Sequence, residues 1–445
     1  MTYLKVKRYG IAALLVALLF TLISLYSAVV LAYADGESTD EPAVEIISEL
    51  NVHFLDVGQA DSCIIELPDG KNMLIDAGEN KTESKKTIID YVEKNIKGTD
   101  GKTIEYFDYV ILTHPDSDHC GGMAAVLKEY PAKVFYRPNV YADREGDFTD
   151  PELSIKELGK NNIKDTAAYY NAIRAGYNPD KINDVETVGH VFDPFNDDIS
   201  LIKPDSLKET DPNYYTFTFY APLGKTYKDW NDYSPVMILD YHGKRFMLSG
   251  DAEKECEKGF VEKAATKEGK YSIFDDDFTV NVFKLGHHGS RTSSSEAFID
   301  VMTTKSSRKD VLAIISCGAG NSYGHPHKDV LDRLESMGFS DENILRTDKM
   351  GTITVSVRGE IAEGSETAAY NLYVNNVVHV DKDAPGLTRK QIYIIIAVVV
   401  IIVLVVIIVG TMRAKKAPQA STRSAHSGAH SSGGAHRTQN KGRKR

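Results

Sequence analysis

Two long uncharged apolar stretches, one near each end, divide this 445-residue sequence before any shorter pattern is considered. Residues 9–34 contain no charged side chain and follow three basic residues, which is the pattern of a secretory signal peptide or a signal anchor. The small residues that end this stretch at Ala34 leave cleavage and retention equally open. Residues 1–34 are therefore expected to export the residues that follow, by either route.

The second stretch, residues 392–409, is unbroken apolar sequence just long enough to cross the hydrocarbon core of a membrane. It predicts a transmembrane helix over residues 391–410. Residues 411–445 are rich in Ser, Gly, His and basic residues, a composition that cannot bury a core and predicts a disordered tail. Because basic residues mark the cytoplasmic side of both stretches, the region between them is expected to lie outside the cell membrane and the tail inside.

The region between the two stretches is strongly acidic. Three of the 52 Lys and Arg residues precede the first stretch and nine follow the second, which leaves 40 in the middle against all 63 Asp and Glu residues, a net charge of −23. Such a surface repels polyanions at long range, which weighs against tight non-specific binding of nucleic acid unless metal ions or a local groove invert the potential. The basic tail, by contrast, could contact anionic lipid headgroups.

Residues 50–360 alternate short β-rich runs with turns and helical segments. Runs at 51–56, 62–67 and 71–76 predict a series of hairpins, and a helix at 82–96 and a strand at 106–113 follow. The second half repeats this order. The strands expected there are 236–241, 245–249, 280–285, 311–316 and 352–357, and the helices are 253–264, 294–302 and 328–337. Strands first and helices mixed in, twice over, predict an α/β sandwich of two packed sheets with helices outside.

Three further segments complete the expected organisation of the exported region. Residues 35–49 are expected to be a linker, and residues 361–390 a juxtamembrane extension. Residues 139–214, rich in Asp, Asn, Pro and Tyr and weak in periodicity, are expected to be an insertion.

The strongest chemical signal is a group of four potential metal ligands within six residues, at the end of the expected strand 106–113. They are His114, Asp116, Asp118 and His119. On a loop that leaves a strand, alternate positions can point to one side, so that imidazole and carboxylate groups converge. Such a set suits Zn, Mn or Fe rather than a thiolate site, and it is complete without the adjoining Cys120. Taken alone, an Asp- and His-rich surface loop could also be a solvated turn.

Two further strand ends weigh against the solvated turn. Asp251 follows the run 245–249, and His287 and His288 follow the run 280–285. Strand ends cluster along one edge of a sheet, so Asp251 can bridge two metal ions and one of the two histidines can complete the second site. The sequence therefore predicts a two-metal centre.

Six segments in combination resemble the extracytoplasmic metallo-β-lactamase domain of the ComEC-type DNA-uptake competence proteins. They are residues 53–62 (HFLDVGQADS), 74–78 (LIDAG), 113–119 (THPDSDH), 248–251 (LSGD), 285–290 (LGHHGS) and 321–326 (NSYGHP). The resemblance covers roughly residues 50–357 and implies the αββα sandwich of the metallo-β-lactamase fold. The family's multi-span channel is absent from this sequence, so transport is not part of the expectation.

The resemblance also implies how the ligands divide between two divalent ions, Zn or Mn. The residues that it gives to the metals are His114, Asp116, Asp118, His119, Asp251 and one of His287 and His288. Of these, His114 and Asp116 bind the first ion, Asp251 bridges, and the others bind the second ion. His325 would face the substrate.

Two such ions would lower the pKa of a shared water and clamp the oxygens of a phosphodiester. Asp118 could also orient the resulting hydroxide, and His325 could protonate the leaving oxygen or hold a phosphate oxygen. We expect a membrane-anchored hydrolase, a phosphodiesterase or nuclease acting on DNA or RNA outside the cell. The alternatives are hydrolysis of another exported ester, such as a choline phosphate or a cell-wall phosphodiester, and a non-catalytic metal-containing sensor or adhesion module. No obligate protein partner can be inferred.

The expected topology gives a first prediction. Protease added to intact cells should remove the domain and spare an epitope tag placed after Arg445, because the membrane would shield the tail. Immunoblotting for the tag checks this. Digestion of the tag with the domain protected would reverse the orientation.

Overall fold

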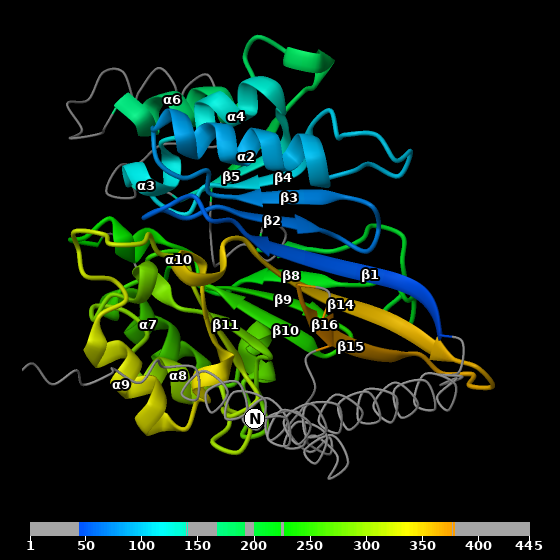
Figure 1. Cartoon of the computed structure of the whole chain (residues 1–445), viewed down its shortest axis with the longest axis vertical. Coiled ribbons are helices and arrows are strands. Elements are labelled where there is room, and N and C mark those ends of the chain that lie inside the picture. Colours follow the sequence, from blue (N-terminus) through cyan, green and yellow to red (C-terminus); the bar gives the residue numbers. More distant parts are fainter. Residues whose placement is uncertain are drawn as a thin grey trace, which may run out of the picture. The chain divides into compact units, whose positions relative to one another are not determined.

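The computed structural model has two β-sheets that pack face to face between two layers of helices (Figure 1). It describes residues 44–138, 140, 167–191, 200–223, 227–375 and 377–378. The expected signal or anchor (1–34), transmembrane helix (391–410) and basic tail (411–445) lie outside the described residues. Within these ranges, no helix is both long and apolar enough to cross a membrane.

The first sheet has nine strands in the order β16-β15-β14-β1-β2-β3-β4-β5-β6. Its strands are β1 (Val44–Phe54), β2 (Cys63–Glu66), β3 (Asn72–Ile75), β4 (Phe107–Ile111), β5 (Ala132–Arg137), β6 (Val188–Val191), β14 (Ile353–Ala362), β15 (Ala369–Val374) and β16 (Val377–Val378). The strands β1 to β3 form the expected hairpins, and β3 to β6 run parallel to one another.

The second sheet has seven strands in the order β13-β12-β11-β10-β9-β8-β7. They are β7 (Leu201–Ile202), β8 (Thr216–Phe219), β9 (Met237–Tyr241), β10 (Lys244–Leu248), β11 (Val282–Lys284), β12 (Leu312–Ile315) and β13 (Ile344–Arg346). The strands β10 to β13 run parallel, and β7 to β10 are antiparallel.

In the described residues, three longer helices cover the outer face of each sheet. The first sheet carries α2 (Thr82–Asn95), α4 (Met123–Glu129) and α6 (Ala167–Gly176), and the second carries α7 (Lys254–Ala264), α8 (Glu296–Met302) and α9 (Lys328–Met337). The short elements are α3 (Ser117–Cys120), α10 (Thr347–Met350), η1 (Ile182–Asp184), η2 (Asn231–Tyr233), η3 (Gly269–Ile273), η4 (Gly286–Gly289) and η5 (Asp341–Asn343). This order of layers is the αββα sandwich expected from the sequence.

The central core lies between the two sheets, and strand periodicity explains it. Leu50, Val52 and Phe54 alternate along β1 with outward polar residues, and they pack in one buried cluster with Phe217 and Leu239 of the second sheet. Burying one such side chain contributes about 1.5–3 kcal/mol relative to leaving it exposed. Helix periodicity supplies the outer cores, as in α2, where Ile88 and Val92 point to the sheet.

The domain extends past the boundaries expected from the sequence. The expected linker 35–49 contains the start of β1, which pairs with β14 from Val44 onward. The expected juxtamembrane extension 361–390 contains the whole of β15, which pairs with β14 from Ala369 to Val374 and so adds a strand to the sheet. Within the expected insertion 139–214, the described residues form α6, β6 and β7, and the two strands extend the edges of the two sheets.

Parallel pairing fixes where the polar loops lie. Because β3 and β4 are parallel in one sheet, and β10, β11 and β12 in the other, the carboxyl ends of each set meet at one edge of its sheet. The loops that follow β4, β10 and β11 carry the expected ligands. The short helix α3, which follows β4, marks this edge in Figure 1.

Candidate metal centre

Side chains from three strand-end loops converge on a small buried volume. One group that could hold a metal ion consists of His114, His119 and Asp251, and a second consists of Asp118, His119 and His288. The loop after β4 supplies His114, and α3 supplies Asp118 and His119. The loop after β10 supplies Asp251, and η4 supplies His288. The structure therefore brings together five of the residues that the sequence singled out.

Asp251 lies at the centre of this arrangement. Its Oδ2 is 3.2 Å from Nε2 of His119, 3.6 Å from Nε2 of His288 and 3.9 Å from Nε2 of His114. Nε2 of His287 lies 3.7 Å from the same oxygen, so one carboxylate oxygen faces four imidazole nitrogens. Such a position suits a carboxylate that shares its oxygens between two cations.

Hydrogen bonds on the far side of two imidazoles fix which nitrogen faces the centre. Nδ1 of His119 donates to Oδ2 of Asp76 at 2.7 Å, and Nδ1 of His288 donates to the carbonyl oxygen of Ser316 at 2.9 Å. A carbonyl or carboxylate oxygen can only accept, so each proton is on Nδ1 and each Nε2 lone pair points inward. Partners of this kind orient metal-binding histidines in proteins.

The orientation of His114 is also fixed from the far side of its ring, here through the hydroxyl of Thr113. Oγ1 of Thr113 donates to Asp76 at 2.6 Å and lies 3.0 Å from Nδ1 of His114, where it accepts. Asp76 therefore supports both His114 and His119. Asp76 lies in one of the resembling segments but was not among the expected site residues, although its position directly after β3 was an available signal.

The inward-facing atoms have no hydrogen-bond partner. They are Nε2 of His114, of His119 and of His288, and Oδ1 of Asp251, and all are buried. Each buried polar group left unpaired costs about 1–3 kcal/mol. Imidazole nitrogen and carboxylate oxygen are ligands that a divalent transition-metal ion takes, so the residues fit such an ion.

Carboxylates dominate the electrostatics of the site. Burial would lower the pKa of His119, but Asp251 and Asp76 raise it well above its usual range. Burial would raise the pKa of Asp118, but the neighbouring His288 and His119 lower it to about 2. The carboxylates thus favour positive charge at this position, which a bound divalent ion could supply.

Asp116 lies at the rim and belongs to neither group. Its side chain is 43% exposed, and its Oδ2 is 3.9 Å from Nε2 of His114. Partial burial raises the pKa of Asp116 to about 6. Its carboxylate faces His114 from the solvent side, so of the expected ligands in this motif it is the least enclosed.

The two adjacent histidines point to different surroundings. His288 is buried in the centre, whereas the His287 side chain is 24% exposed and its Nδ1 lies 3.0 Å from Oε1 of Glu253 and 3.2 Å from Oγ1 of Thr292. Nε2 of His287 is 3.7 Å from Oδ2 of Asp251. Only His288 enters a ligand group, which separates two residues that the sequence left as alternatives.

A buried ion pair lies behind the ligands. Nζ of Lys284 donates to Oδ2 of Asp61 at 2.5 Å, and Oδ1 of Asp61 is 3.9 Å from Nδ1 of His288. Both side chains are almost fully buried. Neither residue was among the site residues expected from the sequence. A lysine inside the apolar run 280–285 was the available signal, because a buried lysine needs a partner.

His325 lies beside the ligand groups, with its ring centroid 5.4 Å from that of His287 and 6.1 Å from that of His288. The N–H of Gly318 donates to Oε1 of Gln59 at 3.0 Å, which leaves the Gln59 amide nitrogen to donate to Nδ1 of His325 at 3.2 Å. Burial, together with His287 and His288, lowers the pKa of His325 to about 4. His325 is therefore neutral near pH 7 and carries its proton on Nε2.

Cys120, which adjoins the motif after β4, and His190 lie outside the two ligand groups. Sγ of Cys120 donates to the carbonyl oxygen of Pro115 at 3.2 Å, and burial raises the pKa of this thiol to about 12. His190 lies on β6 with its ring 5.1 Å from that of Tyr136. Neither is in a position to complete the ligand set of His114.

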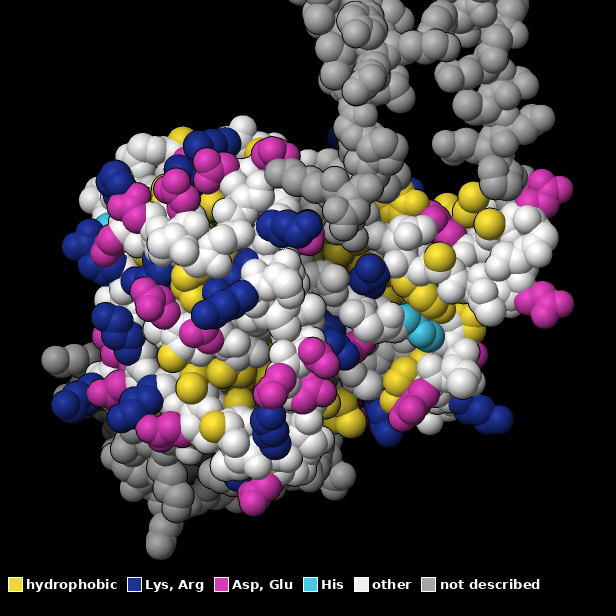
Figure 2. Space-filling view, turned by 90° about the horizontal axis from the view of Figure 1, so that it is seen from below, with side chains coloured by type: hydrophobic (Ala, Val, Ile, Leu, Met, Phe, Trp, Pro, Cys, Tyr) yellow, Lys and Arg dark blue, Asp and Glu magenta, His cyan; other side chains and the backbone are white. Residues whose placement is uncertain are grey.

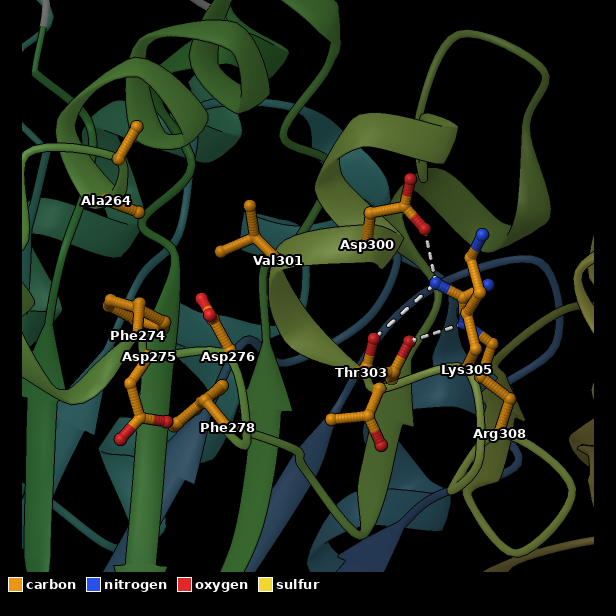
Figure 3. Close-up of a pocket in the computed structure, with 12 residues that line it drawn as sticks. Ala264, Phe274, Asp275, Asp276, Phe278, Asp300, Val301, Thr303, Lys305 and Arg308 are labelled. Carbon is orange, nitrogen blue, oxygen red and sulfur yellow. Dashed lines mark hydrogen bonds and ion pairs between the residues drawn. The ribbon is translucent and has the colours of Figure 1, made fainter.

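A separate hollow lies on the helix side of the second sheet and is lined by residues at the ends of α7 and α8 (Figure 3). Its buried Arg308 donates to Asp300, to Oγ1 of Thr303 at 3.0 Å and to the carbonyl oxygen of Met337 at 3.3 Å. None of the unpaired buried polar atoms in the described part of the chain belongs to its lining. This hollow carries no signal of chemistry.

Comparison with known proteins agrees with the geometry. The model of the metallo-beta-lactamase superfamily matches residues 55–308. ComE operon protein 3 of Bacillus subtilis (strain 168) is 27% identical over 338 residues, which cover 73% of this chain and 35% of that protein. Recombination protein 2 of Haemophilus influenzae is 27% identical over 295 residues, which cover 66% of this chain and 27% of that protein. Competence protein ComA of Neisseria gonorrhoeae is 28% identical over 157 residues, which cover 35% of this chain and 20% of that protein.

The chain spans about a third or less of the length of these relatives. The superfamily is usually hydrolytic and typically binds divalent metal ions, and the clusters around His119 fit that pattern. With the fold, the ligand clusters and the match over residues 55–308 in agreement, the chain belongs to the metallo-beta-lactamase superfamily, in a form similar to the domain of the competence proteins.

Proposed function

We propose that this chain is a metal-dependent phosphodiesterase, a nuclease, whose site holds two divalent ions around Asp251. The observation that carries the proposal is the convergence of unpaired Nε2 atoms from His114, His119 and His288 on one buried carboxylate. Bound divalent ions supply water of lowered pKa and neutralise phosphoryl oxygens. No serine or cysteine nucleophile is then needed.

The charge of the site supports two ions rather than one. With neutral histidines, five carboxylates and one lysine leave a net charge of −4, and Glu253 beside His287 adds one more negative charge, which favours more than one divalent cation. The six residues are Asp61, Asp76, Asp116, Asp118, Asp251 and Lys284. Uncompensated charge of this size is costly in a buried site.

The same contacts support a division of the ligands. Asp118, His119 and His288 would hold one ion, and His114 with the exposed Asp116 would hold the other. Asp251 would contribute to both. Asp118 is 29% exposed, so its carboxylate reaches the solvent side, where it could orient a water.

The tautomer of His325 favours one of its two expected roles. A neutral imidazole with its proton on Nε2 is a hydrogen-bond donor, and its low pKa makes the protonated acid rare near pH 7. We infer that His325 donates to a phosphoryl oxygen of the substrate. A preorganised donor of this kind stabilises charge that develops in the transition state.

The acidic surface favours a second candidate function. Acidic and basic side chains are mixed on the face drawn in Figure 2, and no continuous basic track crosses the described residues there. Together with the net charge of −23 in the exported region, this favours a small exported phosphodiester, such as a choline phosphate or cell-wall ester, over a long polyanion. A non-catalytic sensor would bind metal without turnover.

Membrane anchoring is part of the proposal. The sequence supports a single span at residues 391–410 with the catalytic domain outside and the basic tail in the cytoplasm. The domain would then act at the external face of the cell membrane.

The central prediction concerns Asp251. The purified full chain, supplied with Zn or Mn, should hydrolyse at least one of single-stranded DNA, RNA or a chromogenic phosphodiester, and Asp251→Asn should abolish this activity with little change in the thermal midpoint. The reason is that the carboxylate lies in a loop after β10 rather than in the core. Equal loss of stability and activity would mark Asp251 as structural, and a metal-loaded wild-type chain inert on all three substrates would favour the sensor.

The neighbouring histidines provide a matched pair for the ligand assignment. His288→Ala should lose about one metal ion per chain, because its Nε2 faces Asp118 and Asp251. His287→Ala should keep the metal content, because that ring belongs to the rim. Elemental analysis of the purified variants, with circular dichroism as the control for folding, measures this. Loss of metal in His287→Ala alone would exchange the two roles.

His325→Ala should keep the metal content and lower turnover by about 10²- to 10³-fold, the range for one lost donor to a developing charge. If His325 donates to a phosphoryl oxygen, the loss should persist with a nitrophenyl leaving group, which needs no proton. A loss that disappears with that leaving group would make His325 the general acid instead, and loss of a metal ion would make it a ligand.

A further inference from the structure

Tyr323 is the most exposed of the large hydrophobic side chains in the described residues, at 67% of its full exposure. It lies in the loop between β12 and α9, two residues before His325. An exposed aromatic ring far from a site needs no explanation, but one at the rim of a buried polar centre often contacts a ligand.

The ring of Tyr323 continues a row of rings that leads out of the site. His325 is nearly parallel to His288, at a centroid distance of 6.1 Å and an angle of 25°. Tyr323 is nearly parallel to His325, at 5.7 Å and 23°. The row therefore runs from a buried residue of the metal centre to an aromatic face in solvent.

The loop that displays this ring is held rigidly. The side chain of Asn321 donates to the carbonyl oxygens of Gly318 at 2.9 Å and His325 at 2.6 Å, and its Oδ1 accepts from the N–H of His325 at 2.9 Å. Three hydrogen bonds from one side chain fix the loop on both sides of Tyr323. A ring presented in this way loses little conformational freedom on binding.

We propose that Tyr323 is a stacking platform for an unpaired nucleobase beside the scissile phosphodiester, so that the substrate is a single-stranded nucleic acid. This rests on the proposed phosphodiesterase function. Stacking on an aromatic side chain does not require a particular base, and it requires that the base be free of a duplex. A nucleobase offers the flat π-face on which such a ring stacks, which favours a nucleic acid over a cell-wall ester.

The test compares two strands that differ only in their bases. The zinc-loaded full chain, Tyr323→Ala and the control Tyr323→Phe are measured on a short single-stranded oligonucleotide and on an abasic strand of equal length, for equilibrium binding by fluorescence anisotropy and for turnover. Tyr323→Ala should weaken binding and raise KM for the base-bearing strand by about 5- to 100-fold. It should leave the abasic strand unchanged, and Tyr323→Phe, which keeps the ring, should stay within about twofold of wild type on both.

The platform would be overturned if Tyr323→Ala affected the two strands equally or affected neither. It would also be overturned if the wild type bound neither strand. A selective loss on a choline phosphodiester would assign the ring to a cationic head group and also overturn it. Failure of the proposed phosphodiesterase function would give a different result. In that case the wild type would cleave neither strand, while Tyr323→Ala would still weaken binding of the base-bearing strand alone.

Discussion

The carboxylate of Asp76 is the contact on which the candidate site depends. It accepts from the N–H of Thr113 at 2.8 Å and from its hydroxyl at 2.6 Å, and from Nδ1 of His119 at 2.7 Å. One side chain at the end of β3 thus holds the loop after β4 and the helix α3 in place. Because all three residues are buried, removing the carboxylate would leave three donors unpaired and remove the hydrogen bond that orients His119.

The other half of the site comes from the second sheet, through Asp251 and His288. The centre exists only where the two sheets meet, so the packing of Phe54 and Phe217 between the sheets also sets the distance between the two sets of ligands. Lys284 and Asp61 connect the sheets a second time, as a buried ion pair behind His288. The stability of the sandwich and the geometry of the centre are therefore coupled.

The sequence predicted the elements whose periodicity is strong, such as β9, β10, α7 and α9, to within a few residues. It missed β8, only four residues long, and β15, which lies in the segment read as a juxtamembrane extension. Strand-end reasoning found Asp251 and the motif after β4, because the edge of a sheet collects loops whatever their separation in sequence. It could not choose between His287 and His288, whose directions depend on the local backbone, nor find Lys284, whose partner Asp61 is far away in the chain.

The backbone of the centre limits its chemistry in another way. Asp76, His287 and His288 adopt left-handed conformations, with φ of 57°, 50° and 55°. Side chains other than Asn, Asp and His rarely adopt this region, and each such residue costs of the order of 1–3 kcal/mol, which the surrounding structure must offset. The choice of residue at each of these positions is therefore restricted in two ways, by the side-chain group that the centre needs and by the left-handed backbone of the turn. A β-branched residue at any of them would disturb the loop even where its polarity was suitable.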